Sequence, residues 1–276
     1  MMKKFLSVIT IIMISVPLIA CGDKSKETDI NANSDSTLVQ AEETILQEDT
    51  VNEVNNNVSD LTEDALRSYP ETDASYFITT PSRESMHGVE GEIAIIGYQG
   101  PDSIVVIPEE IDGKRVAAIE YLATENITAL LIPGSVMRVC EDAFMSSYNL
   151  KLVVFEEGIT SIGSGAFLAC RQLETVLLPE TLESIGATAF ASTAITQITL
   201  PSQIREIPQY AFSGLNDLTI TLEDNIESVG TFAFDESNHV TIIVKEGSKS
   251  MEAIEKYNEE ASPDNKEIPP LNIEKK

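Results

Sequence analysis

The sequence predicts a repeat solenoid, a β-rich right-handed coil with a parallel sheet on one face and short helical turns or loops opposite. An Ala-Phe pair recurs at steps of 23, 23, 22 and 22 residues, and an apolar strand end and an aliphatic residue before the turn keep step with it. One such coil buries too little apolar surface to be stable, so neighbouring coils must stack to complete a core. The Ala-Phe pairs begin at Ala143, Ala166, Ala189, Ala211 and Ala233, the strand ends are Ile132, Phe155, Leu178, Leu200 and Leu222, and the aliphatic residues are Val139, Ile162, Ile185, Ile207 and Val229.

The N-terminus predicts export. Residues 1–20 combine Lys3 and Lys4 with an apolar run from Phe5 to Ala20, which is typical of a signal peptide and too short for a spanning helix of ~20 residues. Leu18 to Cys21 resembles a bacterial lipobox, which implies cleavage before Cys21 and lipid attachment to its thiol. The alternative is an ordinary secretory signal followed by a chance cysteine. On the lipobox interpretation, we expect a lipid-anchored protein on the outer face of the bacterial cell membrane.

Residues 21–74 are predicted to be an acidic, disordered linker, because they contain few aliphatic residues and no aromatic before Tyr69. A short helix over Thr37 to Leu46 or Thr62 to Arg67 also fits the local pattern. The repeat domain is expected over residues 75–260, with an N-terminal cap and first coil at 75–126, repeats at 127–246 and a C-terminal cap at 247–260. Residues 261–276 are expected to be a tail.

The residue types within one coil predict which residues face the core, where the strand ends and where the chain turns. Val176 and Leu178 are two residues apart and so face the core together, and Pro179 ends the strand because it has no amide hydrogen. Gly186 is expected to permit the turn, and Phe190 to fill the core beyond it. The same pattern predicts seven stacked strands, which end at residues 107, 132, 155, 178, 200, 222 and 244.

These motifs carry a family resemblance. The run Leu173 to Pro179, then Leu182 to Gly186, then Ala189-Phe190 resembles the BspA-like leucine-rich repeats of bacterial surface proteins. The resemblance covers residues 92 to 246. It implies a surface protein associated with adhesion and contacts to host or matrix, and it names no ligand.

Composition excludes several partners and chemistries. The formal net charge is -27, so nucleic acid and anionic headgroups would be repelled. The two histidines, His87 and His239, are too few for a catalytic triad or a histidine-rich metal site, and no phosphate-loop or zinc signature occurs, so no cofactor is expected. Cys140 and Cys170 are expected to be buried thiols without a disulfide. Acidic pairs after the strands, such as Glu156-Glu157, form either a solvated rim or a weak divalent-cation edge.

The outward face of the sheet is the one surface that stands out. Two columns of residues point away from the core, and none of them is charged. β-Propensity and threonine ladders account for part of this pattern, whereas an aliphatic patch facing water is more typical of an interaction site. The first column is Val106, Leu131, Val154, Leu177, Thr199, Thr221 and Ile243, and the second is Ile104, Ala129, Leu152, Thr175, Gln197, Thr219 and Thr241.

The function predicted from these features is binding, not catalysis. We expect a lipid-anchored adhesion protein that presents Val106, Leu131, Leu152, Val154, Thr175, Leu177, Gln197 and Thr199 to an extracellular protein or glycan. A structural envelope component, packing against itself or another lipoprotein through the aliphatic half of this face, is the alternative. An extracellular enzyme is a remote third, since it would need converging carboxyl groups with raised pKa values.

Overall fold

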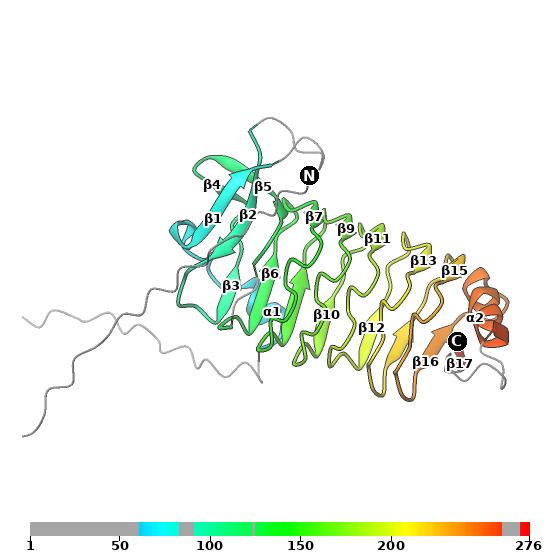
Figure 1. Cartoon of the computed structure of the whole chain (residues 1–276). Helices are drawn as coiled ribbons and strands as arrows, with labels where there is room; N and C mark the ends of the chain where they lie inside the picture. Colours follow the sequence, from blue (N-terminus) through cyan, green and yellow to red (C-terminus); the bar gives the residue numbers. More distant parts are fainter. Residues whose placement is uncertain (1–60, 83–90, 123–124, 261–270) are drawn as a thin grey trace, which may run out of the picture. The chain divides into compact units, whose positions relative to one another are not determined.

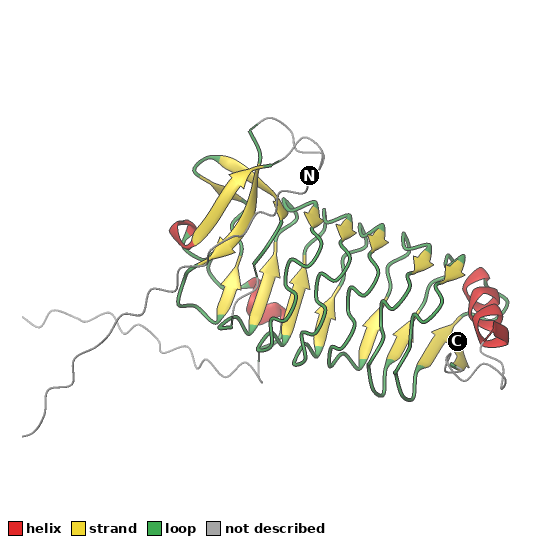
Figure 2. Ribbon diagram, viewed as in Figure 1, coloured by secondary structure: helices red, strands yellow, loops and turns green. Residues whose placement is uncertain are grey.

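The structure is a computed structural model that describes residues 61–82, 91–122, 125–260 and 271–276. The predicted signal peptide, Cys21, His87 and the helix suggested at Thr37 to Leu46 lie outside these residues. In the described part of the chain, two α-helices, one short 3-10 helix and seventeen strands are joined by turns (Figures 1 and 2). The elements are α1 (Glu63–Arg67), the 3-10 turn η2 (Ala74–Tyr76), β1 (Phe77–Pro81), β2 (Ile93–Tyr98), β3 (Ile104–Val106), β4 (Glu110–Ile111), β5 (Lys114–Ile119), β6 (Ala129–Ile132), β7 (Arg138–Val139), β8 (Leu152–Phe155), β9 (Ser161–Ile162), β10 (Thr175–Leu177), β11 (Ser184–Ile185), β12 (Gln197–Thr199), β13 (Glu206–Ile207), β14 (Thr219–Thr221), β15 (Ser228–Val229), β16 (Thr241–Val244), α2 (Lys249–Glu260) and β17 (Asn272–Lys275).

The strands of successive coils stack in parallel, as the period predicts. One four-stranded block has the order β10-β8-β6-β3, and a second has the order β12-β14-β16-β17. In the first block Thr175 pairs with Leu152, 23 residues earlier, and in the second Gln197 pairs with Thr219, 22 residues later. The seven predicted strands occur where the sequence places them, as β3, β6, β8, β10, β12, β14 and β16. We call the two blocks together the main sheet.

The inward residues of the main sheet and the Ala-Phe turns form one core. The alanines and phenylalanines of the five pairs are all at most 1% exposed. The Phe rings stack along the coils, with 5.6 Å between the centroids of Phe167 and Phe190 and 5.8 Å between Phe190 and Phe212. Tyr257 of α2 meets Phe234 edge-on at 5.8 Å and ends this stack. The buried aromatic column therefore joins all five coils.

The side of each coil opposite the main sheet, where short helical turns or loops were expected, contains turns together with a second parallel ladder. The aliphatic residues before each turn lie on two-residue strands, β7, β9 and β11 in one sheet and β13 with β15 in another. The Ala-Phe pairs that follow lie in turns whose amides bind the neighbouring coil: the Phe167 amide donates to the carbonyl of Ala189 in the next coil at 2.8 Å.

Gly186 has a different role from the one expected. Its backbone is not in the left-handed region, but a Cβ placed there would lie 2.3 Å from the backbone nitrogen of Ser164. The glycine is therefore required by the close approach of two coils. The left-handed conformation falls instead on Thr188, with φ 55°, and Gly165 adopts φ 63° at the equivalent place one coil earlier.

Both ends of the repeats are covered by additional elements. At the N-terminal end, β1 pairs antiparallel with β2, and β2 pairs with β5, which continues into the second ladder. At the C-terminal end, α2 buries Ala253, Ile254 and Tyr257. Residues 271–276 were assigned to the tail, but Asn272 to Lys275 form β17 and pair with β16, because the last repeat strand has a free edge to satisfy. None of the described helices is long and apolar enough to cross a membrane.

Candidate binding face

The two outward columns lie outside the core, which confirms their predicted phase. Their first members form a separate apolar cluster with Leu66 of α1. The residues of this cluster are Ile104, Val106, Ala129, Leu131, Leu152, Val154 and Leu66, with Leu61, Tyr69 and Leu177 packed against them. A segment that the sequence assigned to the disordered linker thus occupies the aliphatic half of the sheet face.

The chemistry of residues 61–73 explains why this segment is ordered. Thr62 caps the helix, since its hydroxyl accepts from the Ala65 amide at 3.3 Å. Leu66 is 0% exposed against the sheet. Beyond the helix, the Thr72 amide donates to the Val106 carbonyl at 2.9 Å, and the Val106 amide donates to the Thr72 hydroxyl at 3.0 Å, which satisfies the free edge of β3. The isolated segment looks polar, and its order depends on the apolar sheet beneath it.

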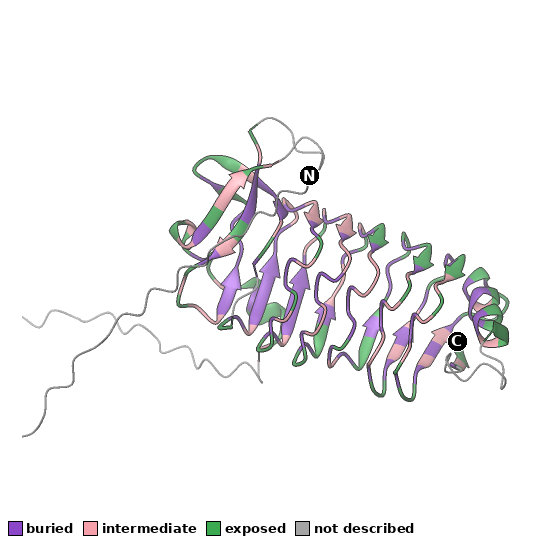
Figure 3. Ribbon diagram, viewed as in Figure 1, coloured by how far each residue is buried: buried purple, intermediate pink, exposed green. Residues whose placement is uncertain are grey.

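Half of the predicted binding face is consequently inaccessible. Val106, Leu131, Leu152 and Val154 are each at most 7% exposed, so they cannot contact a partner while α1 is docked. The remaining residues, Thr175, Leu177, Gln197 and Thr199, lie beyond α1 on β10 and β12, where Leu177 is half-buried and the other three are exposed (Figure 3). We call these four residues the open face.

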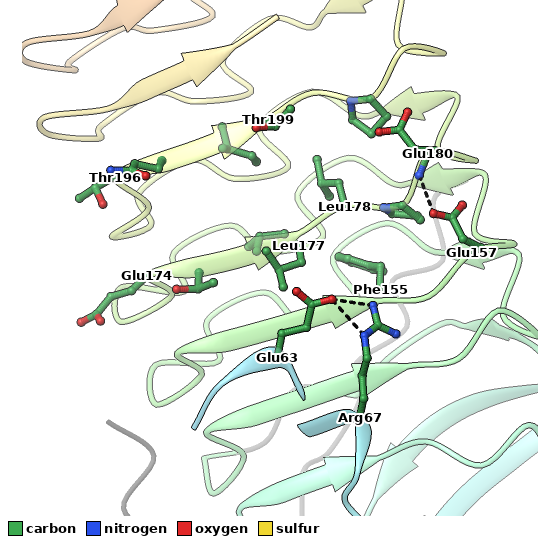
Figure 4. A pocket seen from close by; sticks show the side chains of 16 residues that line it. Glu63, Arg67, Phe155, Glu157, Glu174, Leu177, Leu178, Glu180, Thr196 and Thr199 are labelled. Atoms are coloured by element: carbon green, nitrogen blue, oxygen red, sulfur yellow. Dashed lines mark hydrogen bonds and ion pairs between the residues drawn. The ribbon is translucent and has the colours of Figure 1, made fainter. Parts of the chain in front are cut away.

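The open face forms the floor of a groove of about 630 Å³. Glu63 and Arg67 of α1 stand on one side, and β10 and β12 run along the floor (Figure 4). Glu174 lies at the start of β10, and Glu157 and Glu180 lie beyond its end. The groove volume lies within the ~300 to 1,000 Å³ range of small-molecule sites.

The groove lies across a break in the main sheet. Although β10 and β12 belong to adjacent coils, they are in separate hydrogen-bonded blocks. The break coincides with a change in chain length, because Phe167 precedes Val176 by nine residues whereas Phe190 precedes Ile198 by eight. The second ladder is interrupted in the same coil, between β11 and β13. The residues of β10 and β12 are therefore paired on one side only, to β8 and β14 respectively, and no strand pairs with them across the break.

The groove is acidic, with one fixed cation. Arg67 pairs with Glu63 at 2.9 Å and with Glu156 at 3.3 Å, which joins α1 to the end of β8. Glu157 accepts from the backbone amides of Glu180 and Thr181 at 3.0 and 3.1 Å, so it anchors the next coil. Of this acidic pair, Glu156 therefore binds a side chain and Glu157 binds backbone amides, and among the described residues no group of three or more His, Cys, Asp or Glu side chains could hold a metal.

The other chemically active side chains lie away from the groove. Cys140 and Cys170 are buried and form no disulfide, and burial raises the pKa of the Cys170 thiol to about 12. His239 contacts Asp217 at 3.0 Å on an exposed turn. A backbone amide of Ser75 lowers the pKa of Asp73, and a hydrogen bond from Lys275 lowers the pKa of Glu246.

Comparison with known proteins identifies the repeats. Residues 137–258 match the family model described as BspA type leucine rich repeat region, in six copies. This part of the chain is a BspA-type leucine-rich repeat region. The match begins at β7 and extends through the repeats into α2. No curated protein matches the chain.

Several solved structures of bacterial leucine-rich repeat proteins are similar. A leucine-rich repeat protein from Bacteroides ovatus is 19% identical with a TM-score of 0.45, and the match covers 65% of this chain and 59% of that one. A T. pallidum leucine-rich repeat protein is 22% identical with a TM-score of 0.41, covering 60% of this chain and 91% of that one. This chain therefore spans less than two thirds of the Bacteroides ovatus protein.

Proposed function

We propose that this chain is a lipid-anchored protein of the bacterial cell surface that binds an extracellular protein or glycan through the groove, in an adhesive role. The observation that supports binding is the contrast within one sheet face. The chain covers the aliphatic strands with α1, yet it leaves the uncharged residues of β10 and β12 open beside that helix. A groove with an uncharged floor and an acidic rim is suited to a specific partner.

The alternative as an envelope assembly component loses its main support. That hypothesis used the aliphatic half of the sheet face as a contact surface, and α1 covers it. Binding is the function that these residues favour.

Site-specific photo-cross-linking tests the binding site. The full chain is displayed on bacterial cells with a photoreactive amino acid in place of Gln197, in the groove, or of Ser184, an exposed residue on the second ladder. We expect a discrete adduct from position 197 and none from position 184 when extracellular protein and glycan fractions are added. No adduct at either position, or equal adducts at both, would contradict the proposed site.

The anchor is tested separately. Cys21→Ala removes the thiol that the lipobox-like sequence offers for acylation, so we expect the variant to lose label from a metabolic lipid probe and to leave the membrane fraction. Cys170→Ala is the matched control, because that buried thiol cannot be acylated in the folded protein. Label that persists in Cys21→Ala would refute the lipoprotein assignment.

A further inference from the structure

The rim of the groove has a charge pattern that selects among partners. The side-chain carboxylate of Glu174, at the start of β10, makes no hydrogen bond or ion pair with any described residue, and the residue is exposed. Glu180, beyond the end of β10, accepts only a long 3.5 Å hydrogen bond from the Ser202 amide. Arg67, the one cation that lines the groove, is already paired with two glutamates. Negative charge therefore remains uncompensated at both ends of the floor.

The floor between these charges suits an extended chain. It presents the hydroxyls of Thr175 and Thr199 and the amide of Gln197, with Leu177 beside them. Hydroxyl and amide groups both donate and accept, so they match the alternating N–H and C=O groups of a peptide backbone. No aromatic side chain is exposed on this floor to stack on a sugar ring, since Phe155 is 2% exposed. These features favour a peptide over a glycan.

We infer that the groove, as the binding site of the proposed function, takes an extended segment of a partner protein with basic residues at both ends. Five residues lie between Glu174 and Glu180, three of them in β10, so the two glutamates are at most ~20 Å apart, which corresponds to about six residues of extended chain. The two basic side chains of the partner bind these carboxylates, and the intervening backbone binds the floor.

Two other occupants are disfavoured by charge. Residues 22–60 of this chain contain ten acidic and two basic residues, so they would place further negative charge in an acidic groove. A second copy carries the same net charge of -27 and is repelled in the same way. The partner that fits is therefore a separate, basic protein.

A pair of capped fluorescent pentapeptides tests this inference. Both carry three Thr or Ser residues in the middle, and one has lysine at both ends whereas the other has glutamate. Fluorescence anisotropy with the folded, full chain should show saturable binding of the lysine peptide alone, weakened several-fold between 50 and 500 mM salt. Glu174→Gln with Glu180→Gln should weaken it about tenfold, at roughly threefold for each exposed charge.

Glu183→Gln with Glu206→Gln is the matched control, because it removes the same charge from exposed positions next to or on the second ladder. We expect the control to change the affinity less than twofold. Glu174→Lys with Glu180→Lys should reverse the preference toward the glutamate peptide. Equal losses in both Gln pairs, or no saturable binding of the lysine peptide, would overturn the inference.

The outcomes separate this inference from the proposed function. A cross-link from position 197 to a neutral, acidic or carbohydrate partner would leave the binding function standing and remove the basic-peptide specificity. Binding of the lysine peptide without any cross-link on cells would support the specificity of the groove and count against its use on the cell surface.

Discussion

Replacing Leu66 with alanine should release α1 from the sheet without unfolding the repeats. Leu66 is fully buried against the outward aliphatic residues, and a helix of five residues has no stability of its own in water. Burial of a leucine side chain contributes ~1.5 to 3 kcal/mol. A loss of about 2 kcal/mol would raise the population of undocked segment roughly 30-fold, since 1.4 kcal/mol is a factor of ten.

Two backbone amides report this opening directly. The Thr72 amide donates to the Val106 carbonyl, and the Val106 amide donates to the Thr72 hydroxyl, so both hydrogen bonds break when the segment leaves the edge of β3. Hydrogen exchange followed by mass spectrometry should show both amides exchanging about 30-fold faster in Leu66→Ala. The amides of the Ala-Phe turns should keep their wild-type rates, because local opening leaves the stacked core intact.

Leu215→Ala is the control for this experiment, because Leu215 is also 0% exposed but lies in the repeat core. This variant should lower the midpoint of global unfolding by more than Leu66→Ala does, and it should not selectively accelerate exchange at residues 72 and 106. Unchanged exchange at these two amides in Leu66→Ala would refute the docking described for α1. A global destabilisation equal to that of Leu215→Ala would show that α1 unfolds together with the repeats.

Three further predictions concern the repeats themselves. Phe190→Ala should lower the free energy of unfolding by ~3 to 5 kcal/mol, because the ring is fully buried between two others; a loss below 1 kcal/mol in urea titration would contradict this packing. Thr188→Gly should raise the free energy of unfolding by ~0.5 to 1 kcal/mol, because it relieves a left-handed β-branched residue, and an unchanged or lower midpoint would argue against that backbone conformation. Cys170 should resist iodoacetamide at pH 8.5 in the folded protein and react in urea, because burial raises the pKa of its thiol to about 12. By linkage, the contribution of this thiol to stability is fully present below its ordinary pKa of 9.0 and is lost as the pH rises toward 12. Fast alkylation of the folded protein would contradict the burial.

The period of the sequence predicts the repeat fold well, because each coil repeats the same solution to the same packing problem. Ala189 and Phe190 could be assigned to the core from spacing alone, and both are fully buried. The second ladder could not be predicted in the same way, since two-residue strands leave no alternation to detect. Thr188 likewise gives no signal, because a left-handed residue is expected at glycine or asparagine.

The candidate site shows where local pattern analysis fails. The outward phase of Leu152 and Val154 follows from periodicity, but their burial depends on a segment some 90 residues earlier in the chain. That segment carries only Leu61, Leu66 and Tyr69 as apolar anchors among acidic residues, so its composition resembles a linker. The Thr62 cap was a visible signal of the helix, whereas its docking partner could be found only from the fold.

The change in coil length at Phe190 has a consequence for how such a protein diversifies. In each coil the inward strand residue precedes the next Phe by 14 residues, as from Val176 to Phe190, and only the connector after Phe varies, from nine residues to eight. Duplicating or deleting a whole coil within either block would keep the strand pairing of that block and change only the length of the stack of coils. Inserting one residue after Phe190 should instead join the two blocks into a continuous sheet and close the groove. Insertions and deletions, more than substitutions, would then decide whether a homologue with these repeats has a groove and at which coil it opens.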